Sequence, residues 1–220
     1  MRVAGLKSWR VSVDRQDQSL HVALCIRDHY QIDITENDVP HSLSWHVPIG
    51  QIPFELQNLD ELSGQWLWWW RKLVHVSSHR QLGLDLNGFD GLSNFQDPTG
   101  GTSFFDPYEN FRSLDSHPQL KDLIAGSWRQ GIEWSKPLHQ TSRERARMVV
   151  KDVVEMVIAE RQVSPGSINA SVIVLSVRDD WSTIVHPGVL LCSESTYTDD
   201  SRFALGLKKA IESSSDEPHQ

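Results

Sequence analysis

The sequence has few cysteines, and this scarcity excludes several classes of protein. Only Cys25 and Cys192 occur in 220 residues, and neither belongs to a Cys-x-x-Cys pair. Both lie in apolar runs, which favours buried, reduced thiols in a cytoplasmic protein over a disulfide framework. No stretch reaches the ~18 apolar residues of a membrane span, and residues 1–6 lack the apolar run of a signal peptide. We therefore expect no membrane partner.

Basic residues are outnumbered, and this limits the expected partners. The chain has 21 Lys and Arg against 29 Asp and Glu, a formal net charge of −8. A surface of this sign repels phosphate backbones, so nucleic acid is not an expected partner, whereas a basic protein is. The hydrophobic share of 39% is enough for a sizeable core. We expect a single α+β domain over 1–212, with a seam near 53–58 as the alternative, and a disordered polar tail at 213–220.

Sequence motifs for cofactors and metals are also missing. There is no P-loop, no dinucleotide fingerprint, no Gly-x-Ser-x-Gly elbow and no paired-carboxylate signature. His75 and His79 have the spacing of two ligands on one helix face, but Val76 stands where a zincin would carry its catalytic Glu. The acidic loop after residue 83 fails the EF-hand pattern, because Gln96 replaces the bidentate Glu. These patterns predict no cofactor and no bound metal, and the histidine pair is interpreted as solvated.

Hydrophobic periodicity predicts an α+β fold. Apolar and polar residues alternate with period two in the first quarter of the chain, which is typical of an N-terminal antiparallel β-meander. Its strands are expected at 9–13, 20–26 and 30–34, and the segment 43–47 could add a fourth. Three to four helices should follow, at 59–80, 117–134, 141–163 and 199–211. A C-terminal strand pair at 168–177 and 189–192 should pack on these helices, although the strand after 141–163 could instead join the first sheet.

A tryptophan-rich segment is the most informative feature that is present. Four of the nine tryptophans lie within residues 66–70. At about 100° per residue, Trp66, Trp69 and Trp70 share an apolar helix face, while Trp68 falls on the opposite, polar side. An indole beside cationic side chains is typical of a contact surface in a protein interface. The alternative is that the Gly-rich loop 83–107 folds over Trp68 and buries it.

The sequence leads to a non-catalytic protein-binding module as the first functional hypothesis, of the inhibitor, immunity or adaptor type. Its predicted contact residues are Trp68, Arg71, Lys72 and His75, framed by the loop 83–107 as a lid, an interface or a packed surface loop. The alternative is a hydrolase or thiol-dependent enzyme that uses Cys25 with His21 or His46, three side chains that would share one face of the predicted meander. A third possibility is a structural subunit of a larger assembly, and the oligomeric state stays open.

Overall fold

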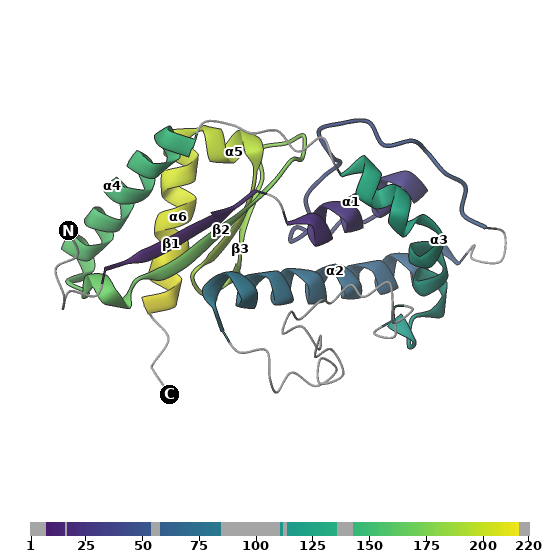
Figure 1. Cartoon of the computed structure of the whole chain (residues 1–220), viewed down its shortest axis with the longest axis horizontal. Coiled ribbons are helices and arrows are strands. Elements are labelled where there is room, and N and C mark those ends of the chain that lie inside the picture. The colour runs from purple at the N-terminus through teal and green to yellow at the C-terminus, as the bar shows by residue number, and fades with distance from the viewer. Residues whose placement is uncertain are drawn as a thin grey trace. The chain divides into compact units, whose positions relative to one another are not determined.

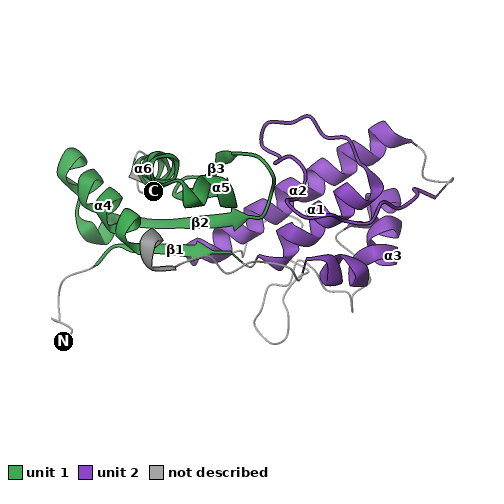
Figure 2. Cartoon of the chain, turned by 90° about the horizontal axis from the view of Figure 1, so that it is seen from above, with its two compact units in different colours: residues 1–16, 139–220 green, residues 17–138 purple. Residues whose placement is uncertain are grey.

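The chain forms two compact units in the computed structural model, which describes residues 8–15, 17–53, 58–84, 111, 114–135 and 143–215. Residues 1–16 and 139–220 form unit 1, and residues 17–138 form unit 2 (Figure 2). Unit 2 is therefore inserted into the chain of unit 1. The single domain 1–212 stays a prediction. Among the described residues the fold is α+β, with a four-stranded mixed sheet and six α-helices (Figure 1).

The sheet of unit 1 brings together strands from both ends of the chain. Its strands are β1 (Arg10–Asp14), β2 (Asn169–Leu175), β3 (Ser182–His186) and β4 (Val189–Ser193), in the order β1-β2-β4-β3. The pairs β1–β2 and β2–β4 are parallel, and only β3–β4 is antiparallel. The predicted strand at 9–13 is thus confirmed, but the prediction that it belongs to an antiparallel meander is wrong. The alternative that the strand after helix 141–163 joins it is confirmed.

Helices α4 (Arg143–Arg161) and α6 (Asp200–Ser215) pack side by side on one face of this sheet (Figure 2). The core between them is aliphatic, with Phe203 as its largest fully buried side chain, and includes Val154, Val172, Leu190 and Leu207. The short helix α5 (Glu194–Thr198) and the 3-10 turn Pro165–Ser167 connect these elements. Helix α6 continues to Ser215, into the segment predicted as a tail, and residues 216–220 lie outside the described part.

The described part of unit 2 contains three α-helices, α1 (Gln18–Tyr30), α2 (Leu59–Leu82) and α3 (Pro118–Trp134). Helix α1 replaces the strand predicted at 20–26, so this part of the meander is wrong. Every residue from Leu20 to Arg27 is buried, including the positions that the alternation assigned to a polar face. A helix that is buried all round has no amphipathic period, so local alternation cannot distinguish it from a strand. Asp17 caps it, accepting a hydrogen bond from Leu20 N at 3.1 Å.

The segments predicted as strands at 30–34 and 43–47 form no sheet, since Leu43 makes only an isolated bridge. Side chains at the end of α1 hold this stretch instead. Arg27 donates hydrogen bonds to the carbonyl oxygens of Pro40 and His41, at 2.5 and 2.9 Å. Asp28 accepts from the backbone N of Leu43 at 2.8 Å. Because these side chains satisfy backbone groups that a ladder would otherwise pair, the segment is ordered without being a strand.

Candidate protein-binding site

Helix α2 is the element that positions all four predicted contact residues. Asn58 caps its start by accepting from Glu61 N at 3.4 Å, and Gly83 ends it in the left-handed conformation, with φ 70°. The prediction of a helix at 59–80 is confirmed. Trp66, Trp69 and Trp70 are 0–1% exposed, whereas Trp68 is only half-buried. The helix register therefore separates Trp68 from its three neighbours, as the helical wheel predicts.

The buried indoles fix the register of α2 against the rest of unit 2. Trp66 donates from Nε1 to the carbonyl oxygen of Ala23 at 3.1 Å, and Trp70 donates to that of Asp38 at 3.3 Å. Their rings stack on each other, with centroids 5.6 Å apart and planes inclined by 9°. Each large apolar ring is thus buried with its one polar atom satisfied, which is how tryptophan stabilises a core. This packing holds Trp68 on the other side of the helix.

Trp68 stacks on His117, the residue that precedes α3. The two ring centroids are 4.1 Å apart and the planes are inclined by 19°. Burial lowers the pKa of His117 below its ordinary value of 6.5, so the imidazole in the stack is neutral at pH 7. Lys72 approaches the same indole, with Nζ 5.8 Å from the ring centroid. Trp68 is therefore the centre of an aromatic-cationic cluster formed by Trp68, Lys72 and His117.

Arg71 has a different role from the cluster beside it. Its guanidinium holds Asp38 with two hydrogen bonds, from Nε to Oδ2 at 2.8 Å and from the terminal nitrogen to Oδ1 at 3.2 Å. A carboxylate oxygen of Glu36 lies 3.9 Å from a terminal nitrogen of the same guanidinium. The hydrogen bond from Arg71 lowers the pKa of the Asp38 carboxyl below its usual value. Arg71 thus ties α2 to the segment after α1, while about half of its side chain (53%) stays exposed.

His75 continues the row of Trp68 and Lys72 along α2, and its ring lies 4.0 Å from that of His79. Both histidines are half-buried. No cluster of three or more His, Cys, Asp or Glu able to hold a metal occurs among the described residues. The loop 83–107 lies outside the described residues from position 85 onward. The structure thus brings Trp68, Lys72 and His75 onto one side of α2 and adds His117, which sequence reasoning missed.

The residues of the alternative enzyme hypothesis lie at and beyond α1 rather than on a sheet face. Cys25 is fully buried, and burial raises the pKa of its thiol to about 12. His21 is also fully buried, with Nδ1 2.8 Å from the carbonyl oxygen of Asp17, whereas His46 is exposed. Cys192 in β4 is equally buried, with a pKa raised to about 12. Neither thiol is a ready thiolate at neutral pH, which a cysteine nucleophile requires.

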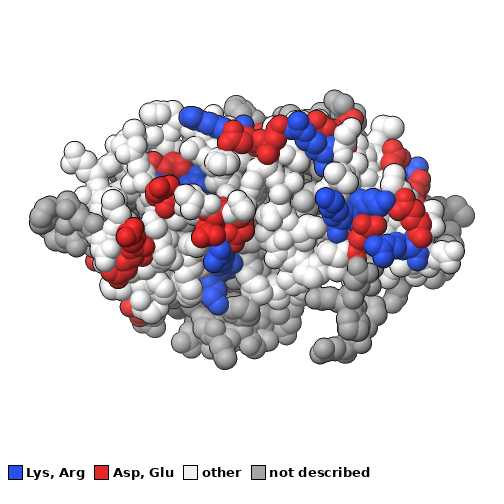
Figure 3. Space-filling model, turned by 180° about the vertical axis from the view of Figure 1, so that it is seen from behind, with Lys and Arg blue, Asp and Glu red and all other residues white. Residues whose placement is uncertain are grey.

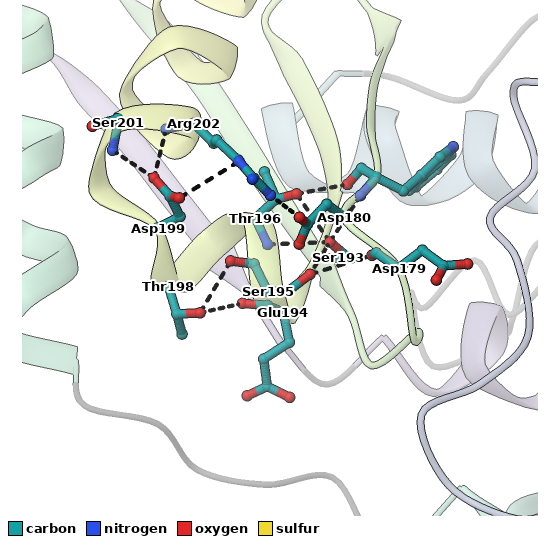
Figure 4. A network of polar contacts seen from close by, with 11 residues as sticks. Asp179, Asp180, Ser193, Glu194, Ser195, Thr196, Thr198, Asp199, Ser201 and Arg202 are labelled. Atoms are coloured by element: carbon teal, nitrogen blue, oxygen red, sulfur yellow. Dashed lines mark hydrogen bonds and ion pairs between the residues drawn. The ribbon is translucent and has the colours of Figure 1, made fainter.

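A network of polar residues at the end of β4 was also missed by sequence reasoning (Figure 4). Ser193 caps α5 by accepting from Thr196 N at 3.2 Å and also accepts from Trp181 N at 3.1 Å. Asp199 accepts from the backbone N of both Ser201 and Arg202 at the start of α6. Each contact satisfies a backbone group at a turn or helix end. This network is a structural one that holds the turns around α5.

An ion pair joins the ends of β1 and β4 in unit 1. A terminal nitrogen of Arg15 lies 2.5 Å from Oε1 of Glu194, and the two side chains are 15% and 23% exposed. The guanidinium also lies over the ring of Tyr197, 5.4 Å from its centroid. Because parallel strands place their carboxyl ends at the same edge of a sheet, residues distant in sequence meet here. The pair anchors the end of β1, after which the chain enters unit 2.

A groove of about 570 Å³ lies between β3 and α6 in unit 1. Its floor is Leu190, and its rims carry two exposed apolar side chains, Ile184 (39%) and Leu205 (57%). Arg202 lies at the end near Asp180, with which it forms an ion pair. No sequence pattern predicted this groove, because β3 and α6 are brought together only by the sheet order.

Comparisons with known proteins identify no relative: no family model matches the chain, and no curated protein or solved structure matches it. Within the described part of the chain, no helix combines the length and apolarity that crossing a membrane requires.

Proposed function

We propose that the chain is a non-catalytic protein-binding module whose contact surface is the aromatic-cationic cluster on α2, with His75 and Arg71 at its border. The observation that carries the proposal is the half-buried indole of Trp68, set apart from three buried neighbours. An indole supplies a large contact area at low entropic cost, because only two side-chain torsions have to be fixed. Its stack on His117 fixes the ring before a partner arrives, which reduces the cost of binding further.

The partner we propose is a basic protein with an apolar side chain that packs against Trp68. The formal net charge of −8 attracts such a partner over long range and raises the association rate. At the border of the cluster, the carboxylates of Asp38 and Glu36 lie beside Arg71 and offer acceptors to incoming cations. On the face drawn in Figure 3, acidic and basic side chains lie next to each other.

An inhibitor, immunity or adaptor role fits this surface better than thiol chemistry. The two described cysteines are buried, and burial holds the pKa of both near 12. A binding surface needs no activated nucleophile, only a rigid and partly exposed set of side chains. The enzyme alternative that uses Cys25 with His21 or His46 stays an untested prediction.

The experiment is a capture of partners with immobilised full-length protein, followed by affinity measurement on each captured partner. Trp68→Ala should weaken binding by about 2 kcal/mol or more, roughly thirtyfold in Kd, as expected for a central interface tryptophan. Trp134→Ala is the matched control, because Trp134 is also half-buried in unit 2 and also lies against a histidine, His29, at 4.5 Å. It should leave binding unchanged.

A second readout separates lost contact from lost folding. Far-UV circular dichroism should be the same for the wild type and both variants. If Trp68→Ala recovers every partner with wild-type affinity while remaining folded, the surface on α2 is not the binding site.

A further inference from the structure

Strand β3 forms one edge of the sheet in unit 1, because the strand order is β1-β2-β4-β3. Antiparallel pairs alternate between hydrogen-bonded and non-hydrogen-bonded positions. Trp181 and Ser193 form a hydrogen-bonded pair, because Ser193 N donates to Trp181 O at 2.8 Å. The next pair along the two strands, Ser182 opposite Cys192, is therefore a non-hydrogen-bonded one. The same holds for Ile184 opposite Leu190. The backbone N–H and C=O groups of Ser182 and Ile184 therefore point outward, away from β4.

The edge lacks the charged residues and the proline that exposed strands usually carry. Charged residues or proline within an edge strand prevent pairing with another chain. The opposite edge strand, β1, begins with Arg10 and ends with Asp14, whereas the sequence of β3, Ser-Thr-Ile-Val-His, contains neither Lys, Arg, Asp, Glu nor Pro. A register irregularity between Ile184 and His186 limits the regular part of the edge to its first residues.

The groove beside β3 carries opposite net charges at its two ends: at one end the carboxylates of Asp180 and Asp199 both contact the single guanidinium of Arg202, and the other end is basic. Helix α6 runs in the same direction as β3, because Arg202 pairs with Asp180 at one end and Ser213 Oγ accepts from Gly188 N at the other. Lys209 lines the groove towards the second end. Two such grooves placed antiparallel would bring the acidic end of each opposite the lysine of the other. This is the charge pattern of a surface that complements itself.

We propose that this edge binds a second copy of the chain, with β3 pairing antiparallel to its counterpart about a two-fold axis at Thr183. In this register the outward groups of Ser182 meet those of Ile184 in the other copy, and all of them gain hydrogen-bond partners. The sheet continues from one copy into the other. The exposed side chains of Ile184 and Leu205 from both copies cover the groove, which removes apolar surface from water. This surface lies in unit 1 and is independent of the surface proposed on α2.

The first test is the mass of the full-length protein in solution, measured by sedimentation equilibrium. At a chain concentration of about 100 µM, well above the micromolar constants of modest interfaces, the wild type should have the mass of two chains. Ile184→Lys places two like charges on either side of the axis, in the groove that the two copies share, and should weaken association by about a hundredfold. Met148→Lys is the control, since Met148 is 70% exposed on α4, and it should remain a dimer. A monomeric wild type, or a dimeric Ile184→Lys, overturns the proposal.

The second test fixes the register and does not depend on a disruptive variant. Facing residues in a non-hydrogen-bonded pair have Cα atoms about 4.5 Å apart, close enough for a disulfide. Thr183→Cys should therefore form a disulfide between copies when oxidised glutathione is added. Ser182→Cys should not, because its counterpart would lie beyond the roughly 7 Å limit. Cys25 and Cys192 are buried and should not compete. Failure of Thr183→Cys to cross-link, or equal cross-linking of both variants, overturns the proposed pairing.

Discussion

Replacing Asp17 by alanine should destabilise unit 2 by about 2–4 kcal/mol. The side chain is 5% exposed and makes two contacts. Oδ1 caps α1 by accepting from Leu20 N at 3.1 Å, and loss of a helix cap costs about 1 kcal/mol. Oδ2 accepts from the hydroxyl of Ser77 on α2 at 2.5 Å. Ser77 is 2% exposed, so its hydroxyl would be left buried without this acceptor, at about 1–3 kcal/mol.

Tryptophan fluorescence during urea unfolding measures this effect, because seven of the nine tryptophans lie within residues 17–138. With a typical urea dependence of about 2 kcal/mol per molar, the midpoint should fall by about 1–2 M. Asp17→Asn is the control. Asparagine still caps a helix, and the hydroxyl of Ser77 can rotate to accept from the amide, so the cost should stay below about 1 kcal/mol. Equal midpoints for the two variants would show that Asp17 does not join α1 to α2 in this way.

Three further predictions follow from burial and packing. Iodoacetamide at neutral pH should label neither Cys25 nor Cys192 until the protein is unfolded, because burial raises both pKa values to about 12; fast labelling of Cys25 alone would instead favour the enzyme hypothesis. Replacing two glycines of α3 by alanine should change the free energy of unfolding in opposite directions, measured by the same urea titration. Gly126→Ala should raise it by up to about 1 kcal/mol, because open space surrounds Gly126, whereas Gly131→Ala should lower it by about 1 kcal/mol net, because the new Cβ would lie 2.9 Å from a methyl group of Val22 on α1. Because the pKa of His117 is lower in the folded protein than in the unfolded chain, a fall in pH below 6.5 protonates the imidazole of the unfolded chain before that of the folded protein and stabilises the unfolded state. The urea midpoint should therefore decrease as the pH falls from 6.5 towards the pKa of the folded protein, and His117→Phe should reduce this pH dependence.

The sequence was informative where one face of an element is buried and the other is not. Helix α2 has such a pattern over 24 residues, and its predicted end at 80 differs from the observed end at Leu82 by two positions. The separate position of Trp68 followed from the same pattern. Its stack on His117 could not be predicted, because it depends on how α3 packs on α2, and no local pattern encodes that contact.

Prediction failed where burial is complete. The period-two alternation at 20–26 is genuine in the sequence, but Ala23 and Cys25, which it placed on the polar face, are apolar and buried. Two local signals favoured a helix: the capping residue Asp17 and the small, apolar residues at those polar positions. For β2, apolar residues on both faces are typical of a parallel strand. That pattern was consistent with pairing to β1, although it could not identify the partner strand.

The pairing of β1 with β2 also explains how unit 1 tolerates the insertion of unit 2. The connection from Asp14 to Asn169 is about five times longer than the ~30 residues of a simple β-α-β unit. The entropic cost of closing a loop grows only with the logarithm of its length, so a connection about five times longer lowers the free energy of unfolding by only about 1.5 kcal/mol. The contacts at β1 can offset a cost of this size. They include the Ser12–Ser171 hydrogen bond at 3.0 Å and the partly buried Arg15–Glu194 pair, in addition to the ladder itself. The ion pair lies at the position where the chain leaves β1, so it stabilises the strand end that the insertion would otherwise leave free to fray.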